Sequence, residues 1–505
     1  MALRAETPPL HERPVRPGLS GGAFKPLADR DLEEVYSSAL DLLETVGMGS
    51  PIPEFIEVVT AAGGWVEGDR LHYPKAVVEA AIETAAKSFV WHGIDEDRSI
   101  DVGGERVHFG TAGAAVLMLD HQSKQFRHST SLDLYDVARL ADTLEHIHFF
   151  VRTVVTRDLV EARDVDINTA YVTLAGTTKP IGTSFFHPDH VYDAVEMFDM
   201  VLGGEGEFRK RPFLVANNTF VVPPLRFAEE SAAAMVAQVR SGMPINLLSA
   251  GQAGATSPAA LAGSLVQALA ECLAALTTVN LIQPGHPCVM GLWPFVSDLR
   301  TGAMTGGSGE EAVLNAAAAQ VANYLGLPSG VAAGMADSKL PDSQAGYEKG
   351  VTVTLAGQAG ANLVYESAGM LASLLGCSLE MMVIDNDLLG SVNRTIRGIE
   401  VNAETLSMEV IRQVVQHPGH FLGHEQTLGL MERDYVYPVV ADRDTPANWA
   451  DNGSLDASDR ARQYVESTLA RHYPKHIAPE IDEAIRARFP IKIDAEHMAE
   501  SSSRW

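Results

Sequence analysis

The turn formed by residues 337–339, Asp-Ser-Lys, is the part of the sequence best suited to contact a ligand. It follows a short apolar run, 330–333, that is typical of a strand, and it precedes a run, 344–357, that is typical of a helix. Ligands of parallel α/β proteins bind where the strands end, and Asp342 is well placed to cap the helix. The local pattern fits a ligand-binding turn and a turn without chemistry equally well.

Side chains with similar potential follow the other apolar runs of the chain. They are aromatic rings, an amide, an arginine and a glutamate: Arg152, Phe185, Phe186, Asn217, Trp293, Tyr365 and Glu366. Aromatic faces attract cations, and a carboxylate adds negative charge, so this set suits a small cationic ligand. The simpler alternative for each aromatic ring is a place in the hydrophobic core.

Other catalytic classes have weaker signals in this sequence. There is no HExxH motif, no P-loop and no GxGxxG fingerprint. His417, His420 and His424 have a spacing that a metal could use, but Pro418 and the glycine after it prevent them from sharing one helix face. We therefore predict no metal site.

The composition is that of a globular enzyme, with 46% hydrophobic and 20% charged residues among 505. Its net charge of −27 argues against nucleic acid or an anionic membrane as a partner. The three cysteines form no CxxC pair, the N-terminus lacks the apolar core of a signal peptide, and polar residues interrupt every long apolar run. These features predict a cytoplasmic protein whose cysteines are buried thiols.

From about residue 104 onward, short apolar runs alternate with long amphipathic runs. Eight strands, each followed by a helix, favour an α/β fold of the (β/α)8 TIM-barrel type over a doubly wound open sheet. The candidate strands are Val107–Leu119, Phe149–Val155, Pro180–Phe186, Pro212–Phe220, Pro244–Ser249, Pro287–Trp293, Gly330–Ala333 and Ala361–Tyr365.

Four segments follow from this pattern. They are an extended arm (1–20), a mainly helical N-terminal cap (21–102), the TIM-barrel domain (103–398) and a helical C-terminal extension (399–505). The extension could pack on the barrel or on a second subunit, so we expect a homo-oligomer.

Four long segments resemble the trimethylamine methyltransferase family. They are GMADSKLPDSQAGYEKG, MTGGSGEEAVLNAAAAQVANYLGLPSG, VIDNDLLGSVNRTIRGIEV and HFLGHEQTLGLMERDYVYP, and the resemblance covers the chain from about residue 10 to 490. It implies a TIM barrel that transfers a methyl group to a corrinoid (cobalamin) carried by a partner protein. Members that use trimethylamine carry pyrrolysine in the strand-end region that Gly334 and Met335 match, whereas this chain has ordinary residues there.

The resemblance to members without pyrrolysine implies a quaternary amine as the substrate. Glycine betaine comes first, with proline betaine, carnitine and butyrobetaine as alternatives. A quaternary ammonium already carries the positive charge that lets a neutral amine leave, so attack by Co(I) needs no general acid and no zinc. Orientation and exclusion of water would then carry the catalysis.

Roles for the candidate residues follow from this substrate class. Phe185, Phe186, Trp293 and Tyr365 would form aromatic walls around the methylammonium group, and Glu366 or Asp337 would supply negative potential. Lys339, Arg152 or Asn217 would donate a hydrogen bond to a betaine carboxylate. Gln252, Ser338 and Gln344 would contact the corrinoid. Two other functions stay open: a Schiff-base aldolase that uses Lys339, and a betaine-binding barrel without catalysis.

Overall fold

The centre of the protein is a ring of eight parallel strands. The computed structural model describes residues 9, 13, 15–416, 419–502 and 504–505. In ring order the strands are β7 (Arg106–Phe109), β10 (Phe150–Val151), β11 (Ile181–Thr183), β12 (Leu214–Asn218), β13 (Ile245–Ser249), β15 (Cys288–Leu292), β18 (Ser329–Ala332) and β19 (Leu363–Tyr365). A parallel bridge between Gly110 and Phe149 joins the first strand to the second and closes the ring.

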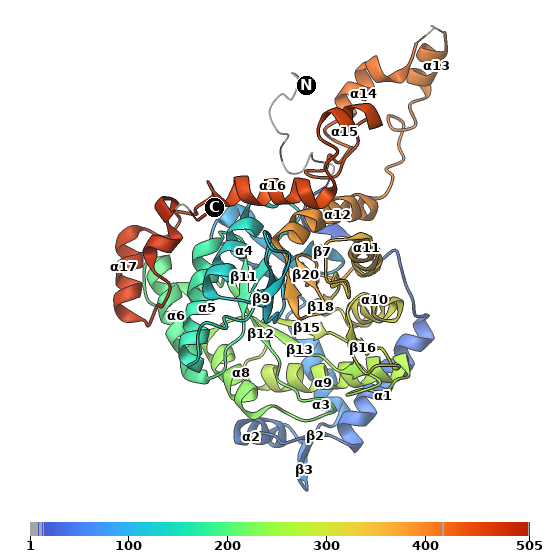
Figure 1. The fold of residues 1–505 in the computed structure, drawn as a ribbon. Coiled ribbons are helices and arrows are strands. Elements are labelled where there is room, and N and C mark those ends of the chain that lie inside the picture. The colour runs from blue at the N-terminus through green and yellow to red at the C-terminus, as the bar shows by residue number, and fades with distance from the viewer. Residues whose placement is uncertain (1–8, 10–12, 14, 417–418, 503) are drawn as a thin grey trace.

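A helix follows each strand and packs outside the ring, as Figure 1 shows. These helices are α4 (Ser131–Thr143), α5 (Ala162–Gly176), α6 (Pro188–Leu202), α8 (Glu229–Ser241), α9 (Leu261–Ile282), α10 (Gly309–Tyr324), α11 (Ser343–Gln358) and α12 (Leu379–Arg397). The short α7 (Glu207–Lys210) lies between α6 and β12. The prediction of a (β/α)8 barrel is therefore confirmed.

The predicted strand Val107–Leu119 is divided in two. The first half is β7, and the second half, β8 (Leu117–Leu119), belongs to a separate sheet with β9 (Phe126–His128), β20 (Met370–Leu371) and β21 (Gly376–Cys377). The chain turns away at Gly110, where a Cβ would lie 2.4 Å from the ring of Phe149, and at Gly113, whose φ of +148° disfavours other residues. Another small sheet is formed by β14 (Gln252–Ala253), β16 (Phe295–Ser297) and β17 (Met304–Thr305). Its strands come directly after β13 and β15 in the chain.

Residues 19–103 cover one side of the barrel and its N-terminal end. Helices α1 (Asp29–Thr45), α2 (Pro53–Ala61) and α3 (Lys75–Thr84) pack on α9. The segment also holds short strands that the helical pattern did not indicate: β1 (Leu19–Ser20), β2 (Met48–Gly49), β3 (Trp65–Glu67), β4 (Arg70–His72), β5 (Ser88–Trp91) and β6 (Ile100–Gly103), with η2 (Glu96–Arg98) between the last two. Trp91 closes the barrel floor, because its Nε1 donates to the Phe213 carbonyl at 3.0 Å and its ring lies 5.0 Å from that of Phe149.

Helix α9 is apolar because it is a core helix. By length and hydropathy it could cross a membrane, but 83% of its most apolar window is buried between the barrel and the N-terminal helices. Cys272, Cys288 and Cys377 are all buried, as predicted.

The C-terminal part begins with an arm that extends sideways beyond the ring of helices (Figure 1). The arm contains α13 (Met408–Gln416), η3 (Phe421–Gly423) and α14 (Glu425–Leu430); α15 (Pro446–Asp451), α16 (Ala457–Leu469), α17 (Pro479–Arg488), η4 (Ala495–Met498) and η5 (Glu500–Ser502) follow.

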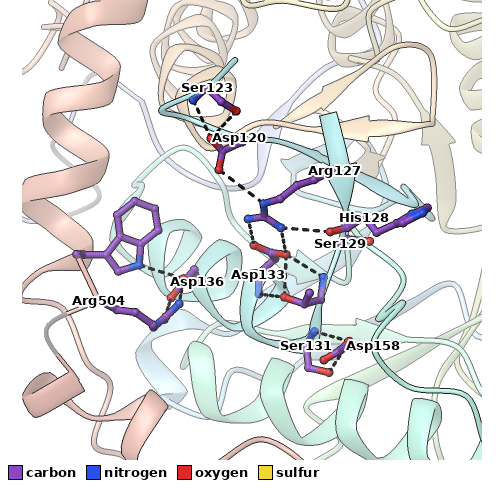
Figure 2. Close-up of polar contacts among 12 residues, drawn as sticks. Asp120, Ser123, Arg127, His128, Ser129, Ser131, Asp133, Asp136, Asp158 and Arg504 are labelled. Atoms are coloured by element: carbon purple, nitrogen blue, oxygen red, sulfur yellow. Dashed lines mark hydrogen bonds and ion pairs between the residues drawn. The ribbon is translucent and has the colours of Figure 1, made fainter. Parts of the chain in front are cut away.

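The chain end is fixed to α4. Figure 2 shows Arg504 at the carboxylate of Asp136, which also accepts a hydrogen bond from the Trp505 indole at 3.0 Å. Asp136 pairs in addition with the fully buried Arg139 at 2.7 Å. In the same view Arg127 bridges Asp120 and Asp133, which fastens the β8–β9 hairpin to the start of α4.

Candidate functional site

An aromatic layer fills the barrel interior near the ends of β15 and β19. The ring of Tyr365 lies 5.2 Å from that of Trp293 and 5.1 Å from that of Phe149. The Tyr365 hydroxyl and the Trp293 Nε1 are buried and have no hydrogen-bond partner within the protein. Buried polar atoms are normally satisfied, so these two groups indicate a place where a ligand or water completes the structure.

Two buried carboxyl groups interact with each other near the end of β19 and the start of α10. Glu366 directly follows Tyr365, and Glu311 comes from the first turn of α10; neither has a hydrogen-bond partner for either oxygen. Burial raises the pKa of Glu366 to about 8, although Lys349 lowers it, and burial together with the charges of Glu366 and Asp337 raises the pKa of Glu311 well above its ordinary value. With a pKa of about 8, Glu366 is mostly protonated at neutral pH, and a cation placed beside it would favour loss of its proton.

Glu366 is held in an unusual backbone conformation. Its φ of +60° lies in the left-handed region that residues other than glycine rarely adopt. Such conformations persist where the surrounding structure enforces them, often at functional sites.

A buried ion pair supports the loops around these carboxyl groups. Lys349 of α11 and Asp385 of α12 are fully buried, with 3.0 Å between Nζ and Oδ2. Lys349 also donates to the Gly334 carbonyl, and Asp385 accepts from the Gly369 amide at 2.7 Å. Lys349 is thus committed to Asp385 and leaves Glu366 without a cationic partner.

A cavity of about 190 Å³ lies at the ends of β10, β11 and β12. Its lining includes Arg152, Asp166, Phe185, Phe186 and Asn217. Burial lowers the pKa of Arg152, whereas the charge of Asp166 raises it. Four candidate residues from the ends of three strands, Arg152, Phe185, Phe186 and Asn217, therefore line this cavity, with Phe186 at the rim because it is 54% exposed.

An amide pair connects this cavity to the aromatic layer. The Asn246 Nδ2 donates to the Asn217 Oδ1 at 3.2 Å, and the Asn246 Oδ1 has no partner. Gly330 lies between Asn246 and Tyr365. A Cβ at this position would be 2.9 Å from the tyrosine ring and 3.4 Å from the Asn246 Oδ1. Asn246 thus lies between the cavity residue Asn217 and Gly330, which packs against the Tyr365 ring.

The turn at 337–342 is built largely for local structure. The Asp337 Oδ1 accepts from the Gly306 amide at 2.7 Å and from the Ser373 hydroxyl at 2.8 Å. Ser338 donates to Asp342, and Asp342 caps α11 by accepting from the Ala345 amide, as predicted.

The remaining candidates of this region lie apart from the cavity. Lys339 is exposed, and its Nζ donates to the Asp337 carbonyl at 2.7 Å, so the structure does not bring it to Arg152. The Gln344 side chain donates to Glu348 at 2.8 Å.

A second, open groove of about 540 Å³ adjoins Asp337. Ser297 and Thr305 line it, and their buried hydroxyl groups have no partner. Gln252 lies beside the groove, because it pairs with Phe295 in the parallel β14–β16 ladder.

Sequence reasoning missed Glu311 and Asn246. Glu310 and Glu311 both lie in the first turn of a helix, where acidic side chains interact favourably with the helix dipole. Only the tertiary structure shows that Glu311 is the one that is buried. Asn246 has no local signal beyond a polar residue inside an apolar strand. Within the described residues, no group of three or more His, Cys, Asp or Glu side chains could hold a metal ion; His417 lies outside them.

The fold and the site define an α/β-barrel protein whose strand ends carry buried aromatic, amide and carboxyl groups. The family model for trimethylamine methyltransferase (MTTB) matches residues 11–496, so the chain belongs to that family and is a methyltransferase. The family resemblance of the sequence is therefore confirmed.

Two curated relatives cover almost the full chain. The trimethylamine methyltransferase MttB of Desulfitobacterium hafniense (strain DSM 10664 / DCB-2) is 31% identical over 472 residues, which is 93% of each chain. The glycine betaine methyltransferase of Desulfitobacterium hafniense (strain Y51) is 28% identical over 466 residues, 91% of this chain and 95% of that protein.

Among solved structures, the Methanosarcina barkeri monomethylamine methyltransferase (MtmB) has a similar fold. It superimposes with a TM-score of 0.52 at 11% identity, over 88% of this chain and 87% of that one. At this identity the likeness concerns the fold alone.

Proposed function

We propose that this methyltransferase moves a methyl group from a quaternary amine, glycine betaine first, to the corrinoid of a partner protein. Proline betaine, carnitine and butyrobetaine are the alternative substrates. The observation that carries the proposal is the pair of buried, unpartnered carboxyl groups, Glu311 and Glu366, together with the Trp293–Tyr365 layer that Glu366 directly follows in the chain. Aromatic faces and carboxylates together are the groups that recognise an alkylammonium ion.

The start of the β18–α11 turn supports a quaternary over a tertiary amine. A Cβ at Gly334 would lie 2.6 Å from the Ser367 Cα and 2.8 Å from Val353, and the φ of Gly334 is +106°. The next residue, Met335, is fully buried. The turn therefore has no room for a side chain at Gly334, in the region where the family resemblance implies pyrrolysine for trimethylamine-using members.

The cavity supports a substrate with a carboxylate. Arg152 is the cation among its lining residues, and an arginine forms strong, paired hydrogen bonds with carboxylates. Asn217 lines the same cavity and leads through Asn246 to Tyr365. A betaine would lie along this path with its carboxylate at Arg152 and its methylammonium group at the aromatic layer.

The groove beside Asp337 fits part of a corrinoid brought by another protein. A corrin ring carries amide side chains, and the unpartnered hydroxyls of Ser297 and Thr305 can bond to amides. Gln252 adds an amide next to them. When bound, the reduced corrinoid supplies the nucleophile that accepts the methyl group. Ser338 and Gln344, whose side chains serve local hydrogen bonds, are weaker candidates for this contact.

The protein's own contribution is orientation and charge. The aromatic layer holds the methylammonium group and excludes water. As the methyl group leaves, the nitrogen loses its positive charge, so a permanent anion beside it would stabilise the substrate more than the transition state. The Glu366 carboxyl, with a pKa of about 8, therefore serves binding and release rather than the transfer step: its Oε atoms lose a proton to solvent as the cation binds and take one back from solvent after the neutral amine has formed.

A methyl-transfer assay with the full chain tests the proposal. The chain is mixed with a reduced corrinoid protein and each quaternary amine, and the loss of the Co(I) absorption is followed. We expect transfer from glycine betaine and none from trimethylamine. Transfer from trimethylamine alone would refute the substrate class, and tight betaine binding without transfer to any corrinoid protein would favour a non-catalytic barrel.

The role of Arg152 has its own test. Arg152→Gln removes one charge-assisted hydrogen-bond donor, which is worth about 1.5–3 kcal/mol. Calorimetry should therefore show roughly a tenfold to hundredfold loss of glycine betaine affinity, with little change for tetramethylammonium, which has no carboxylate. Arg163→Gln, on the surface of α5, is the matched control and should change neither affinity. Equal losses for both ligands in Arg152→Gln would contradict the assignment.

A further inference from the structure

The arm, which is the described part of residues 399–432, exposes ten large apolar side chains. They include Leu406, Met408, Ile411, Val415, Leu422 and Leu428. A contiguous exposed apolar surface of this kind marks an interaction site.

Helix α13 shows that the exposure is organised. Met408, Ile411 and Val415 recur at helical spacing and share one face, whereas Gln413 lies on the opposite face. No residue of α13 is buried. An amphipathic helix normally buries its apolar face, so α13 lacks its packing partner within this chain.

The base of the arm is hydrogen-bonded to α12. The carboxylate of Asp387 accepts hydrogen bonds from the amides of Val439, Val440 and Ala441 at 2.6–2.9 Å. Arg397 donates to the Arg433 carbonyl at 2.6 Å and pairs with Asp434 at 2.8 Å, which fastens the two ends of the arm together. From this base the arm extends away from the ring of helices that could have covered it (Figure 1).

We propose that the arm packs against a second copy of this chain. At about 150 Å² for a fully exposed large apolar side chain, the exposed fractions of the arm add up to roughly 900 Å². A stable interface buries about 800 Å² on each partner. One arm thus presents enough apolar surface for a stable dimer, and the two-fold symmetry usual for homo-oligomers places two such arms in one interface.

Position and charge argue against other occupants. A protein that accepts the methyl group must reach the strand ends, whereas the arm extends sideways from α12 (Figure 1). The arm carries five glutamates, at positions 400, 404, 409, 425 and 432, and a single arginine, Arg412. That excess of negative charge opposes binding to an anionic lipid surface.

The molar mass of the full chain in solution tests the proposal. Light scattering after size exclusion should give at least twice the 54.2 kDa of one chain at micromolar concentration. Ile411→Glu with Val415→Glu should raise the dissociation constant of the oligomer by at least about tenfold, because two charges would enter the apolar contact. Gln413→Glu adds a charge on the opposite face of α13 and should keep the wild-type mass.

A second pair of variants and a folding control complete the test. Leu422→Glu with Leu428→Glu should also dissociate the oligomer, and circular dichroism should show unchanged helix content in all variants. A monomeric wild type would overturn the proposal, as would wild-type mass in both apolar-to-glutamate variants. A monomer that binds a corrinoid protein or zwitterionic lipid vesicles through the arm would overturn it in favour of that partner.

Discussion

Replacement of Glu366 by glutamine should stabilise the protein, and the gain should grow with pH. Glu366 has a pKa of about 8 in the folded protein, raised from its ordinary value of 4.5 by burial. Between these two pH values the folded state holds a proton that the unfolded state has lost. The free energy of unfolding of the wild type therefore falls as pH rises through this window, whereas a neutral glutamine does not titrate.

The magnitude follows from the same two pKa values. Each pH unit within the window corresponds to about 1.4 kcal/mol. Glu366→Gln should then exceed the wild type by little at pH 4.5, by about 3 kcal/mol at pH 7 and by about 5 kcal/mol above pH 8. These gains are upper limits, because local relaxation around a charged Glu366 would reduce them.

Urea unfolding at pH 5, 7 and 9 measures the effect. Glu205→Gln, at an exposed position, is the matched control and should show no such pH trend. A gap between Glu366→Gln and wild type that stays constant or shrinks with rising pH would refute the assignment of a protonated, unpartnered Glu366.

The same protonation state has a consequence for ligand binding. A quaternary ammonium bound beside Glu366 should displace up to about one proton at pH 7. Calorimetry of glycine betaine or tetramethylammonium binding in two buffers of different ionisation enthalpy measures that release. Wild type should release the proton and Glu366→Gln should not; equal proton release by both proteins would show that another group titrates.

Two further substitutions test the framework around the site. Lys349→Met should destabilise the fold by about 3–5 kcal/mol in urea unfolding, because Asp385 would remain buried without its partner, and the double variant with Asp385→Leu should recover part of the loss. A double variant no better than the single one would contradict this. Gly334→Ala should lower the urea midpoint and the methyl-transfer rate together, since its Cβ would approach the Ser367 Cα to 2.6 Å at a φ of +106°; wild-type values for both would show that the loop can move aside.

The barrel and much of its periphery could be predicted from the residues alone. The alternation of short apolar runs with long amphipathic ones is local information, since it reports the period of each element, and eight repeats indicate a closed barrel. The Asp342 cap and the buried cysteines are local too, and both are observed. The family could also be read from the sequence, because long matching segments do not depend on knowing the fold.

The candidate site was only partly predictable. Phe185 and Asn217 line the cavity with Arg152, and Trp293 and Tyr365 form the aromatic layer, because strand ends of a barrel converge at one face. The reach of a side chain is not encoded in its position along the strand. Lys339 follows a strand as Glu366 does, yet its long side chain turns to solvent.

What the sequence determined by itself was the order of the elements, their closure into a barrel and the methyltransferase family. What only the tertiary structure decided was which polar groups lack partners. Glu310 and Glu311 are adjacent and chemically identical, but packing of α10 exposes the first and buries the second without a partner. Burial and pairing depend on contacts between residues far apart in the chain, and these contacts set the charge of the site and leave the arm uncovered.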